Sequence, residues 1–431
     1  MIGAGIAGIH TALDLADRGF TVYLVEKNPS IGGRMAQLSK TYPDLECASC
    51  TLTPKALEVE KHSNIRLLTL SEVRDVRRDG KTFKVKIQRK PRFVDEKKCT
   101  GCGVCAQHCP VEVANDFDER IGVRSAIYIP HPTAVPLVYT VDKDHCLRCE
   151  LCQNVCTNKA VNLQQRSEDL DIEVGAIVVT TGCNPFDVRK YDEYGFGRHD
   201  NVITGLALER LLTFAGPTGG HVLRLSDGRI PKKVAFVQCV GPKDKNHSNL
   251  YCSKVCCMYA TKLAQMLKEQ IPDADVTIYY PESLATSNGF EEFHERAKKQ
   301  LGIKYVKAEV KEVAERPQHI LLLRGVHAES GKTLEDEADM VVLSTGLVPA
   351  ASGDFGGSLS LKTGLGNFFE SINPKAGGVT TNIESVFIAG TAEGPKSIAE
   401  SIQQAHSAAF KASDALEMLT KTGSMSIKSS Q

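Results

Sequence analysis

Residues 2–38 read IGAGIAGIHTALDLADRGFTVYLVEKNPSIGGRMAQL, and this stretch decides the fold. Its glycines Gly3, Gly5 and Gly8 stand before an amphipathic helix, and the apolar strand that follows ends at Glu26. Glycines at this spacing allow a tight turn and bring a pyrophosphate close to the backbone at the helix N-terminus. The acid at the strand end can accept hydrogen bonds from both ribose hydroxyls. The stretch therefore predicts a dinucleotide site in a doubly wound α/β fold.

Further residues of the same stretch extend this site. Lys27 follows the acid, and a Gly-Gly-Arg segment containing Gly33 and Arg34 is the second glycine pair typical of flavoproteins. Only two residues precede Gly3, whereas the first strand of this fold normally has about five apolar residues. We therefore expect the sequence to begin inside a longer protein, with room for a further domain upstream.

Composition argues against several classes of function. The chain has 431 residues, 42% of them hydrophobic, which is enough for two or three packed domains. Lys plus Arg and Asp plus Glu each number 52, so no global field favours nucleic acid or an anionic membrane. No apolar run approaches the roughly 20 residues that span a bilayer, and no secretion signal is visible. We expect a cytoplasmic protein with no membrane span and no nucleic-acid partner.

Three more apolar strands end in glycine turns far downstream. AIVVTTGCNP contains Gly182, MVVLSTGLVP contains Gly346, and SVFIAGTAEGPKSI contains Gly390, with a helix expected to begin near Ser397. This distribution favours FAD over NAD and resembles the thioredoxin-reductase-like flavoproteins, in which an FAD domain is interrupted by a second nucleotide-type domain. Thr391 stands where that family usually has an acid.

An insertion contains two copies of a C-x2-C-x2-C-x3-C pattern, CTGCGVCAQHC at 99–109 and CLRCELCQNVC at 146–156. Three cysteines of such a loop wrap one corner of a [4Fe-4S] cubane, while the fourth reaches the neighbouring cluster. The alternative is a pair of zinc sites, but zinc sites do not require a repeated four-cysteine pattern with this spacing. We therefore assign two crossed ligand sets: Cys99, Cys102, Cys105 and Cys156 for one cluster, and Cys146, Cys149, Cys152 and Cys109 for the other.

A later strand begins like a nucleotide-binding unit but continues with cysteines. VAFVQCVGPKDKNHSNLYCSKVCC at 234–257 precedes an expected helix and a further strand, which complete a βαβ unit. In a reductase of this fold the turn would carry glycines for NAD(P)H. Here Cys239 stands at the strand end, and Cys252, Cys256 and Cys257 stand at the helix start. We predict a third [4Fe-4S] cluster, with a group of buried or redox-reactive thiols as the alternative.

With these motifs the sequence resembles, over nearly its full length, the A subunit of heterodisulfide reductase and its relatives in other anaerobes. The motifs that carry the resemblance are GAGIAGI at 3–9, GGRMAQLSKTYP at 32–43, CASCTLTPK at 47–55, both ferredoxin loops, the cysteine set at 239–257, and AGTAEGPKSI at 389–398. The resemblance implies a cluster at the 239–257 set. It also implies that Cys47 and Cys50 are partial ligands of a shared fourth cluster. A redox dithiol and a structural pair are the alternatives for these two cysteines.

The remaining candidates are expected around the flavin. Lys396 and Arg34 are cations that would stabilise anionic reduced flavin, with ordinary surface charge as the alternative for each. Cys183 is expected to be a small buried thiol near FAD. His108, beside Cys109, is interpreted as a packing residue near a cluster. No catalytic triad or acid–base pair is readable, so no residue is predicted to act on an organic substrate.

These assignments divide the chain into six segments. We expect an FAD-binding domain in three parts, interrupted first by a ferredoxin-like domain and then by a Rossmann-like domain that carries the third cysteine set. The predicted order is 1–92 (FAD), 93–166 (ferredoxin-like), 167–231 (FAD), 232–345 (Rossmann-like), 346–420 (FAD) and a tail at 421–431.

The predicted function follows from the cofactors. FAD exchanges one or two electrons and a cubane exchanges one, so the chain is expected to distribute electrons. The resemblance implies an oxidoreductase subunit of a heterodisulfide-reductase-like complex, with donor and acceptor subunits and a homodimer within a larger assembly. The sequence leaves open whether the flavin bifurcates electrons. The rival interpretations are a stand-alone NAD(P)H-dependent iron-sulfur flavoprotein reductase, which would keep glycines at the second turn, and a cluster-bearing scaffold.

Overall fold

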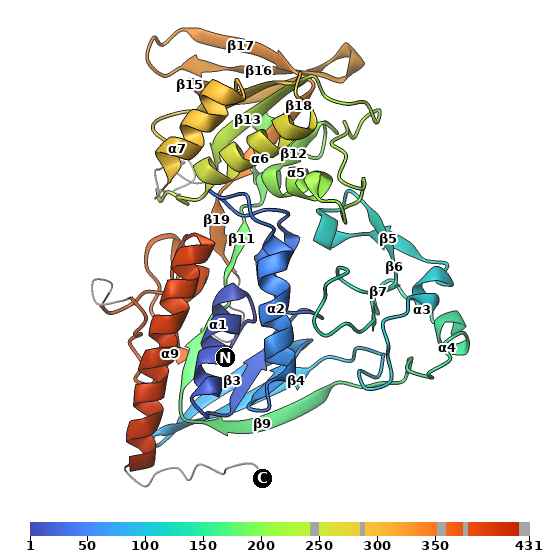
Figure 1. Cartoon of the computed structure of the whole chain (residues 1–431), viewed down its shortest axis with the longest axis vertical. Coiled ribbons are helices and arrows are strands. Elements are labelled where there is room, and N and C mark those ends of the chain that lie inside the picture. The colour runs from blue at the N-terminus through green and yellow to red at the C-terminus, as the bar shows by residue number, and fades with distance from the viewer. Residues whose placement is uncertain (242–249, 285–288, 351–358, 374–377, 422–431) are drawn as a thin grey trace.

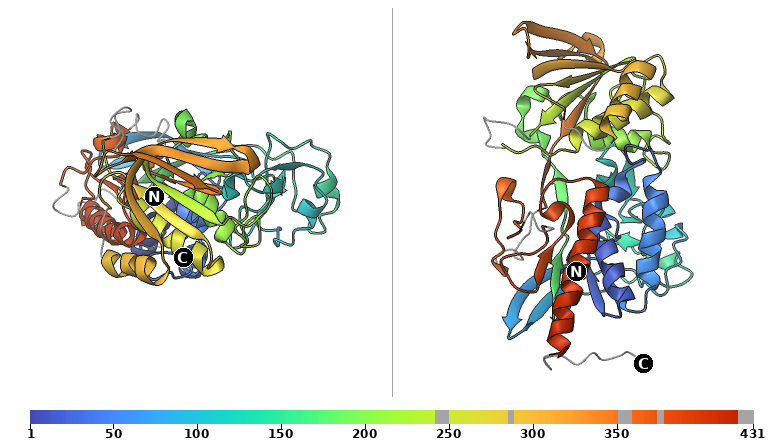
Figure 2. Two further views of the ribbon diagram at one scale, coloured as in Figure 1. Left: turned by 90° about the horizontal axis from the view of Figure 1, so that it is seen from above. Right: turned by 60° about the vertical axis from the view of Figure 1, so that its left-hand side comes forward.

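Three parts make up the molecule (Figure 1). Two layered α/β units are stacked along the long axis, and a smaller, loop-rich unit lies beside them. In a view from above, the loop-rich unit projects to one side of both (Figure 2). The computed structural model describes residues 1–241, 250–284, 289–350, 359–373 and 378–421.

The first unit is built on a parallel sheet. Strand β1 (Val22–Val25) pairs with β2 (Ile65–Leu68), and β10 (Ile177–Val179) pairs with β20 (Val386–Ile388). Ile2 forms parallel bridges to both β1 and β10 and so joins the two pairs. The short segment before the first glycine turn therefore occupies the central position of the sheet, where the first strand of a doubly wound fold is expected.

Helices and a second sheet cover the two faces of this layer. Helix α1 (Ile6–Asp17) packs against α2 (Ala48–Lys61) and the long α9 (Ile398–Lys421), and the three run side by side in Figure 2. Small buried residues allow the close contact, since Thr11 Oγ1 donates to the Ala405 carbonyl across 3.3 Å.

An antiparallel sheet packs on the opposite face. It consists of β3 (Ser71–Asp79), β4 (Thr82–Arg89) and β9 (Glu168–Val174), in that order. Phe83 and Ile87 of β4 are fully buried and belong to the same apolar cluster as β10 and β20. The first unit thus has three layers, helix, parallel sheet and antiparallel sheet.

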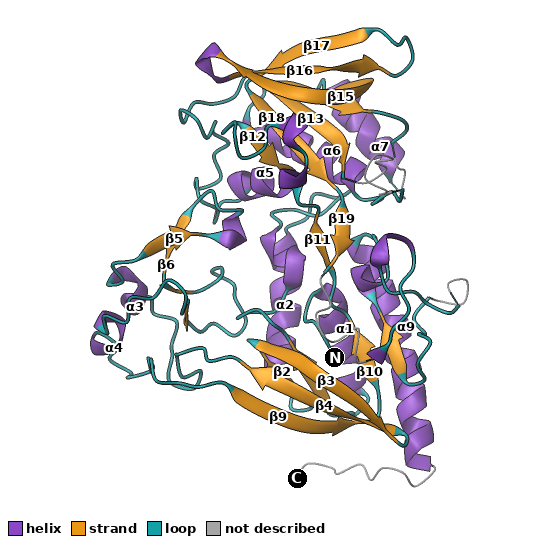
Figure 3. Ribbon diagram, turned by 180° about the vertical axis from the view of Figure 1, so that it is seen from behind, coloured by secondary structure: helices purple, strands orange, loops and turns teal. Residues whose placement is uncertain are grey.

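The second α/β unit has one seven-stranded sheet. Its order is β12 (Val202–Thr204), β18 (Met340–Thr345), β13 (Lys233–Val240), β14 (Asp275–Tyr280), β15 (Lys304–Arg316), β16 (Ile320–His327) and β17 (Thr333–Ala338). The strands are parallel as far as β15 and antiparallel beyond it. Its helices are α5 (Gly205–Leu212), α6 (Cys256–Gln270) and α7 (Phe290–Glu295) (Figure 3).

One predicted boundary differs from this arrangement. Residues 167–231 were expected to belong wholly to the FAD-binding domain, yet β12 pairs with β18, and both β12 and α5 contribute to the core of the second unit. All three residues of β12 are buried, but a three-residue strand is too short to show a period in the sequence. The second unit therefore begins before β12.

Two short strands connect the units. Strand β11 (Cys183–Pro185) leaves the first unit, β19 (Leu347–Pro349) returns to it, and the two pair antiparallel. The connection lies between the stacked units in Figure 1. Within the described residues, no helix combines the length and apolar character needed to cross a bilayer.

The inserted unit contains little regular structure. It consists of α3 (Val104–Gln107), β5 (Glu112–Ala114), β6 (Val123–Ser125), β7 (Ile127–Tyr128), β8 (Thr140–Val141) and α4 (Leu151–Asn154). Strand β5 pairs with β6 and β7 with β8, both antiparallel. Its apolar cluster includes the buried Cys105 and Cys152, so cysteines form part of the core of this unit.

Candidate functional site

The first glycine turn is closed too tightly for any side chain. Gly3 has φ +99°, and a Cβ added to it would lie 2.4 Å from the Thr180 carbonyl oxygen. A Cβ on Gly8 would lie 2.1 Å from the Gly3 carbonyl oxygen. Helix α1 starts directly after this turn, and the first N–H groups of a helix have no partner within the helix. The turn is therefore shaped as a cradle for a phosphate group.

Glu26 lies at the end of β1 beside this turn and is only 6% exposed. Its Oε2 accepts from the Ala4 N–H at 2.9 Å, and its Oε1 accepts from the N–H and side-chain amide of Asn28. Burial raises the pKa of Glu26, while these donors and the charge of Lys27 act in the opposite direction. The carboxylate is fixed by the backbone and keeps acceptor capacity for a ribose.

The other flavin glycines converge on the same region. A Cβ on Gly33 would lie 2.9 Å from Gly5 Cα, which brings the second glycine pair against the first turn. Gly390 meets α1, since a Cβ there would lie 2.7 Å from the Ala7 Cβ, and Gly182 lies next to Thr391. Segments far apart in the sequence thus assemble one site.

Two cations and a thiol meet beside these glycines. Arg34 and Lys396 both interact electrostatically with Cys183, which also shares a hydrogen bond with Thr391. Burial raises the pKa of the Cys183 thiol against the effect of both cations. Lys396 is held by Glu393 at 2.6 Å, so its charge is locally compensated.

The guanidinium of Arg34 is anchored by neutral groups. It donates to Asn184 Oδ1 and to Gln37 Oε1, each at 2.9 Å. Since neither partner carries a charge, these contacts orient the cation of Arg34 without cancelling it.

Gly346, for which an FAD contact is also predicted, lies at the connection between the two α/β units. Its N–H donates to the Val240 carbonyl at 2.9 Å, and its carbonyl accepts from the Phe186 N–H at 2.8 Å. These bonds place it beside the end of β13, and its contact with FAD stays a prediction.

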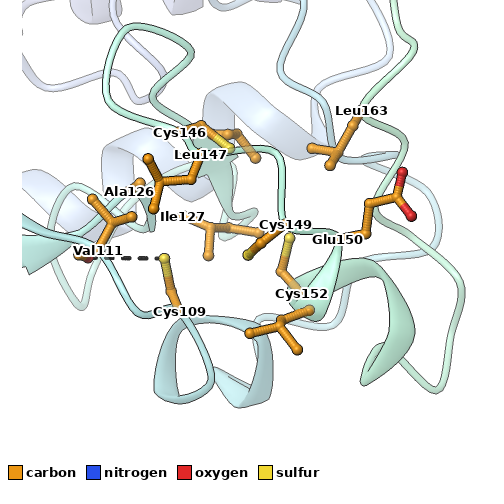
Figure 4. A pocket seen from close by; sticks show the side chains of 12 residues that line it. Cys109, Val111, Ala126, Ile127, Cys146, Leu147, Cys149, Glu150, Cys152 and Leu163 are labelled. Carbon is orange, nitrogen blue, oxygen red and sulfur yellow. Dashed lines mark hydrogen bonds between the residues drawn. The ribbon is translucent and has the colours of Figure 1, made fainter.

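The cysteines assigned to one ferredoxin-type cluster line a single small pocket (Figure 4). Cys146, Cys149 and Cys152 come from the second loop, and Cys109 comes from the first, as the crossed assignment requires. Apolar side chains such as Ile127 and Leu163 complete the wall. A pocket lined by four cysteine sulfurs and, apart from Glu150, by apolar side chains fits an iron-sulfur cluster.

Three cysteines of the other ferredoxin set, Cys99, Cys102 and Cys105, lie near one another. Burial, with Cys99, Cys102 and Cys152 nearby, raises the pKa of Cys105 to about 12. The turn that follows Cys156 approaches this loop, since Asn158 Nδ2 donates to Thr100 Oγ1 at 3.4 Å. Thiols with raised pKa values bind as thiolates only when a metal stabilises the anion.

The two ferredoxin loops adopt the same backbone with different residues. Gly101 and Gly103 have positive φ in the first loop, and Arg148 and Glu150 take the corresponding positions in the second, with φ +53° and +62°. A left-handed conformation costs a non-glycine residue about 1–2 kcal/mol. The sequence repeat predicted equal loops, but it gave no sign of this strain.

The third cysteine set gathers at the second turn. Cys239, one residue before the end of β13, has a left-handed conformation with φ +64°, and Cys256 and Cys257 are buried in the first turn of α6. Burial raises the pKa of Cys256 well above its usual range, with Cys257, Cys239 and Cys252 acting in the same direction. The helix begins at Cys256, which places both adjacent cysteines at its N-terminus.

Two tyrosines flank this set, and the sequence alone did not identify them. Tyr42, from the loop after the second glycine pair, and Tyr251 both interact electrostatically with Cys256. Tyr251 also interacts with Cys183, and its hydroxyl donates to the Leu347 carbonyl at 2.7 Å. Tyr251 thus lies between the flavin glycines and the third set; its position directly before Cys252 was the available signal.

Cys47 and Cys50 are joined in a disulfide at the start of α2. Partial iron ligation by this pair stays a prediction, and it would require prior reduction to two thiolates. The arrangement corresponds to the oxidised form of the dithiol alternative.

A buried polar junction fixes the three units relative to one another. Lys262 of α6 and Glu209 of α5 form an ion pair at 2.5 Å with both side chains fully buried. Lys262 also donates to the Lys40 carbonyl at 2.8 Å, and Glu209 accepts from the Ser39 N–H at 2.7 Å. These bonds attach the second unit to the segment that follows the second glycine pair.

The inserted unit joins the same junction. Arg210, next to Glu209, pairs with Asp118 of the insertion at 2.8 Å and donates to the Gln37 carbonyl at 3.0 Å. The guanidinium lies over the Phe117 ring. Glu209, Arg210, Lys262 and Asp118 are called the junction network below. They were not predicted, because no local pattern marks them.

Within the described residues, no three His, Cys, Asp or Glu side chains converge closely enough to hold a single metal ion. The candidate sites are therefore the wider cysteine sets described above.

Two family models match this chain. An NAD(P)-binding Rossmann-like domain matches residues 1–55, and a 4Fe-4S binding domain matches residues 92–114. Among solved structures, thioredoxin reductase from T. acidophilum is similar, with a TM-score of 0.54 and 15% sequence identity. The similarity covers 96% of this chain and 97% of the reductase. The Lactococcus lactis thioredoxin reductase has a TM-score of 0.56 at 14% identity, with 97% and 98% covered. Fold and sites together define an iron-sulfur flavoprotein with a thioredoxin-reductase-like fold.

Curated relatives narrow the class to a family. The A subunit of the H2:CoB-CoM heterodisulfide,ferredoxin reductase of Methanothermobacter marburgensis is 48% identical over 96% of this chain and 63% of its own length. The iron-sulfur A subunit of the CoB-CoM heterodisulfide reductase of Methanocaldococcus jannaschii is 46% identical over 95% of this chain and 63% of its own length. By sequence, the chain belongs to the family of heterodisulfide reductase A subunits, and it spans less than two thirds of the length of these relatives.

Proposed function

We propose that this chain is the electron-distributing flavoprotein part of a heterodisulfide-reductase-like complex, an oxidoreductase subunit that receives electrons from one protein and delivers them to others. The observation that carries the proposal is the third cysteine set, Cys239, Cys252, Cys256 and Cys257, at the turn where a related reductase would bind NAD(P)H. A chain with an inorganic carrier at that turn exchanges electrons with proteins.

The residues assign a place to each cofactor. The glycines at 3, 5, 8, 33, 182 and 390, with Glu26 and Lys27, would hold FAD, and the two crossed ferredoxin sets and the third set would hold [4Fe-4S] clusters. FAD exchanges one or two electrons and each cluster exchanges one. Arg34 and Lys396 would supply the cations that stabilise anionic reduced flavin, and the hydrogen-bond partners of Arg34 carry no charge.

The relative position of the sites supports distribution rather than simple storage. Tyr251 lies between the flavin side, through Cys183, and the third set, through Cys256. The junction network ties the ferredoxin insertion to the same two regions. Splitting of an electron pair between two outlets is the finer form of this proposal, and the partners are donor and acceptor subunits around a homodimer.

Counting cofactors tests the proposal. Anaerobically purified protein should contain roughly twelve irons and as many acid-labile sulfides per FAD, as three cubanes require. About eight irons per flavin would remove the third cluster and with it the proposal. A signal of a fourth cluster that requires reduced Cys47 and Cys50 would assign that pair.

The rival function is a self-contained NAD(P)H-dependent reductase. It is favoured only by the general fold, because the second turn has cysteines in place of a glycine set. NADH or NADPH added to the purified protein should leave the flavin absorbance unchanged, and rapid bleaching would reinstate a nucleotide site. Tightly bound flavin after gel filtration would in turn exclude a purely structural scaffold.

A further inference from the structure

Gln238 is a buried amide without a partner. It is 4% exposed on β13, directly before Cys239. Among the described residues, neither its Nε2 nor its Oε1 has a hydrogen-bond partner. Buried polar groups in folded proteins nearly always have partners, so an amide unpaired at both ends indicates that a group normally bound there is missing.

Gln238 stands in an irregular part of β13. The register of β13 against β18 shifts between Val237 and Val240, and Cys239, within this interval, has φ +64°. Such a bulge re-aims side chains away from the strict alternation of a strand. Cys239 also interacts electrostatically with Cys256 in the first turn of α6, so Gln238 is bonded to a residue that lies beside the third cysteine set.

The start of α6 is also close to this end of the sheet. The Cys256 thiol donates to the carbonyl of Thr345, the last residue of the neighbouring strand β18, at 3.5 Å. Strand β18 pairs with β13 up to Val240, two residues beyond Gln238. The amide and the buried cysteines thus share one small region between the strand ends and the helix.

An iron-sulfur cluster would supply the missing partner. Sulfide and thiolate sulfurs accept hydrogen bonds, and the amide N–H groups of Gln238 are donors.

We propose that the Gln238 amide donates a hydrogen bond to the cluster held by Cys239, Cys252, Cys256 and Cys257 and raises its reduction potential. This inference rests on the proposed function, because it needs the third cluster. A donor stabilises the negative charge added on reduction, so its removal makes reduction harder. In this proposal Gln238 does not transfer electrons itself; it changes only the reduction potential of the third cluster.

The test is a redox titration of the holoprotein followed by electron paramagnetic resonance. Gln238→Leu should keep full iron and FAD content, shift the third-cluster potential to more negative values, and leave the ferredoxin-type clusters unchanged. Gln238→Asn keeps the amide but withdraws it by one methylene, so it should shift the same cluster by a smaller amount in the same direction.

A matched control separates tuning from general disturbance. Gln265 on α6 is also fully buried with an unpaired Oε1 among the described residues, but its amide donates to the Phe293 carbonyl at 3.2 Å. Gln265→Leu should leave the third-cluster potential unchanged.

Two results would overturn the inference. Full iron in Gln238→Leu with an unmoved potential would show that the amide binds water or another part of the chain. If Gln238→Leu does not assemble the cluster, an unmoved potential in Gln238→Asn decides the matter in the same way. The proposed function fails separately, because wild-type protein with about eight irons per flavin would have no third cluster for Gln238 to contact.

Discussion

The two nucleotide-type turns of this molecule occupy equivalent places but solve different problems. In each unit a buried strand ends, the chain turns, and a helix starts (α1 in one and α6 in the other). Gly3 takes a left-handed conformation at the first turn and Cys239 takes one at the second. A glycine does so without steric cost, whereas a cysteine loses about 1–2 kcal/mol.

This difference shows what each turn is built to hold. At the first turn, backbone atoms approach so closely that no Cβ fits, which leaves room only for a ligand that touches the backbone. At the second turn, the side chains themselves converge, and the chain accepts local strain to direct a thiol. The left-handed backbone of Cys239 is strained, and it lies near three other cysteines. We infer that the thiol of Cys239 is required at this position.

The largest effect is expected at the first turn. Gly8→Ala would place a Cβ 2.1 Å from the Gly3 carbonyl oxygen, which only a shift of the backbone can relieve. We expect a loss of about 3 kcal/mol in unfolding free energy and loss of bound FAD. Denaturant unfolding and flavin content after gel filtration measure both.

Gly19→Ala is the control for this change, since nothing lies within 4 Å of its Cβ position although φ is +89°. It should cost only about 1 kcal/mol and keep the flavin. Retention of FAD by Gly8→Ala would contradict the cradle assigned to the first turn.

The second turn is broken by Cys256→Ser. The substitution keeps a small side chain but removes one ligand of the third set, so about four of roughly twelve irons should disappear while FAD stays bound. Iron and acid-labile sulfide assays give the result. Cys183→Ser, at a thiol outside every predicted ligand set, should leave the iron content unchanged, and an unchanged content in Cys256→Ser would refute the third cluster.

Glu26→Gln sharpens the comparison at the ribose end of the first turn. A neutral amide weakens the hydrogen bonds to ribose hydroxyls by about 1.5 kcal/mol, so FAD affinity should fall roughly tenfold. The iron content should not change. A flavin titration of the depleted protein measures the affinity, and equal affinities would show that the carboxylate serves only the Ala4 and Asn28 amides.

The same variant predicts a pH effect on the flavin-depleted protein. Burial raises the pKa of Glu26, so the folded chain binds its proton more tightly than the unfolded chain does. Its contribution to stability is therefore fully present below the unfolded pKa of about 4.3 and is lost as pH rises through the folded value. Glu26→Gln should flatten this part of the profile. A wild-type profile already flat over that range would contradict the raised pKa.

The smallest expected effect is none at all. Because the second turn lacks the glycines that admit a pyrophosphate, a millimolar excess of NADH should neither bleach the flavin nor protect the chain against thermal unfolding. An increase in the unfolding temperature on addition of NADH would contradict this prediction, because the second turn would then bind a nucleotide as the first turn is expected to do.

Local patterns predicted much of this architecture. Helix α9 begins within about one residue of the expected start near Ser397, because apolar periodicity and glycine turns are encoded locally. The crossed ferredoxin assignment also depends only on spacing, and Cys109 does line the cavity of the second loop. Spacing suffices where the chemistry lies in one continuous loop.

What the sequence did not predict depends on contacts between distant segments. The hydrogen bonds of Gly346 to Val240 and Phe186 join segments far apart in the chain and exist only once it has folded. The ion pair of Lys262 with Glu209 joins residues that look like ordinary helix surface in sequence. Strand β12 was missed for the related reason that its partner β18 follows much later in the chain.

The junction network has a mechanical consequence. A swivel of one α/β unit against the other about the β11–β19 connection would have to separate Lys40 from Lys262 and Asp118 from Arg210. Removing one partner of a buried ion pair costs about 3–5 kcal/mol, so such a swivel would be rare at ambient temperature. The distances between the redox centres are then set when the chain folds and stay constant during electron transfer.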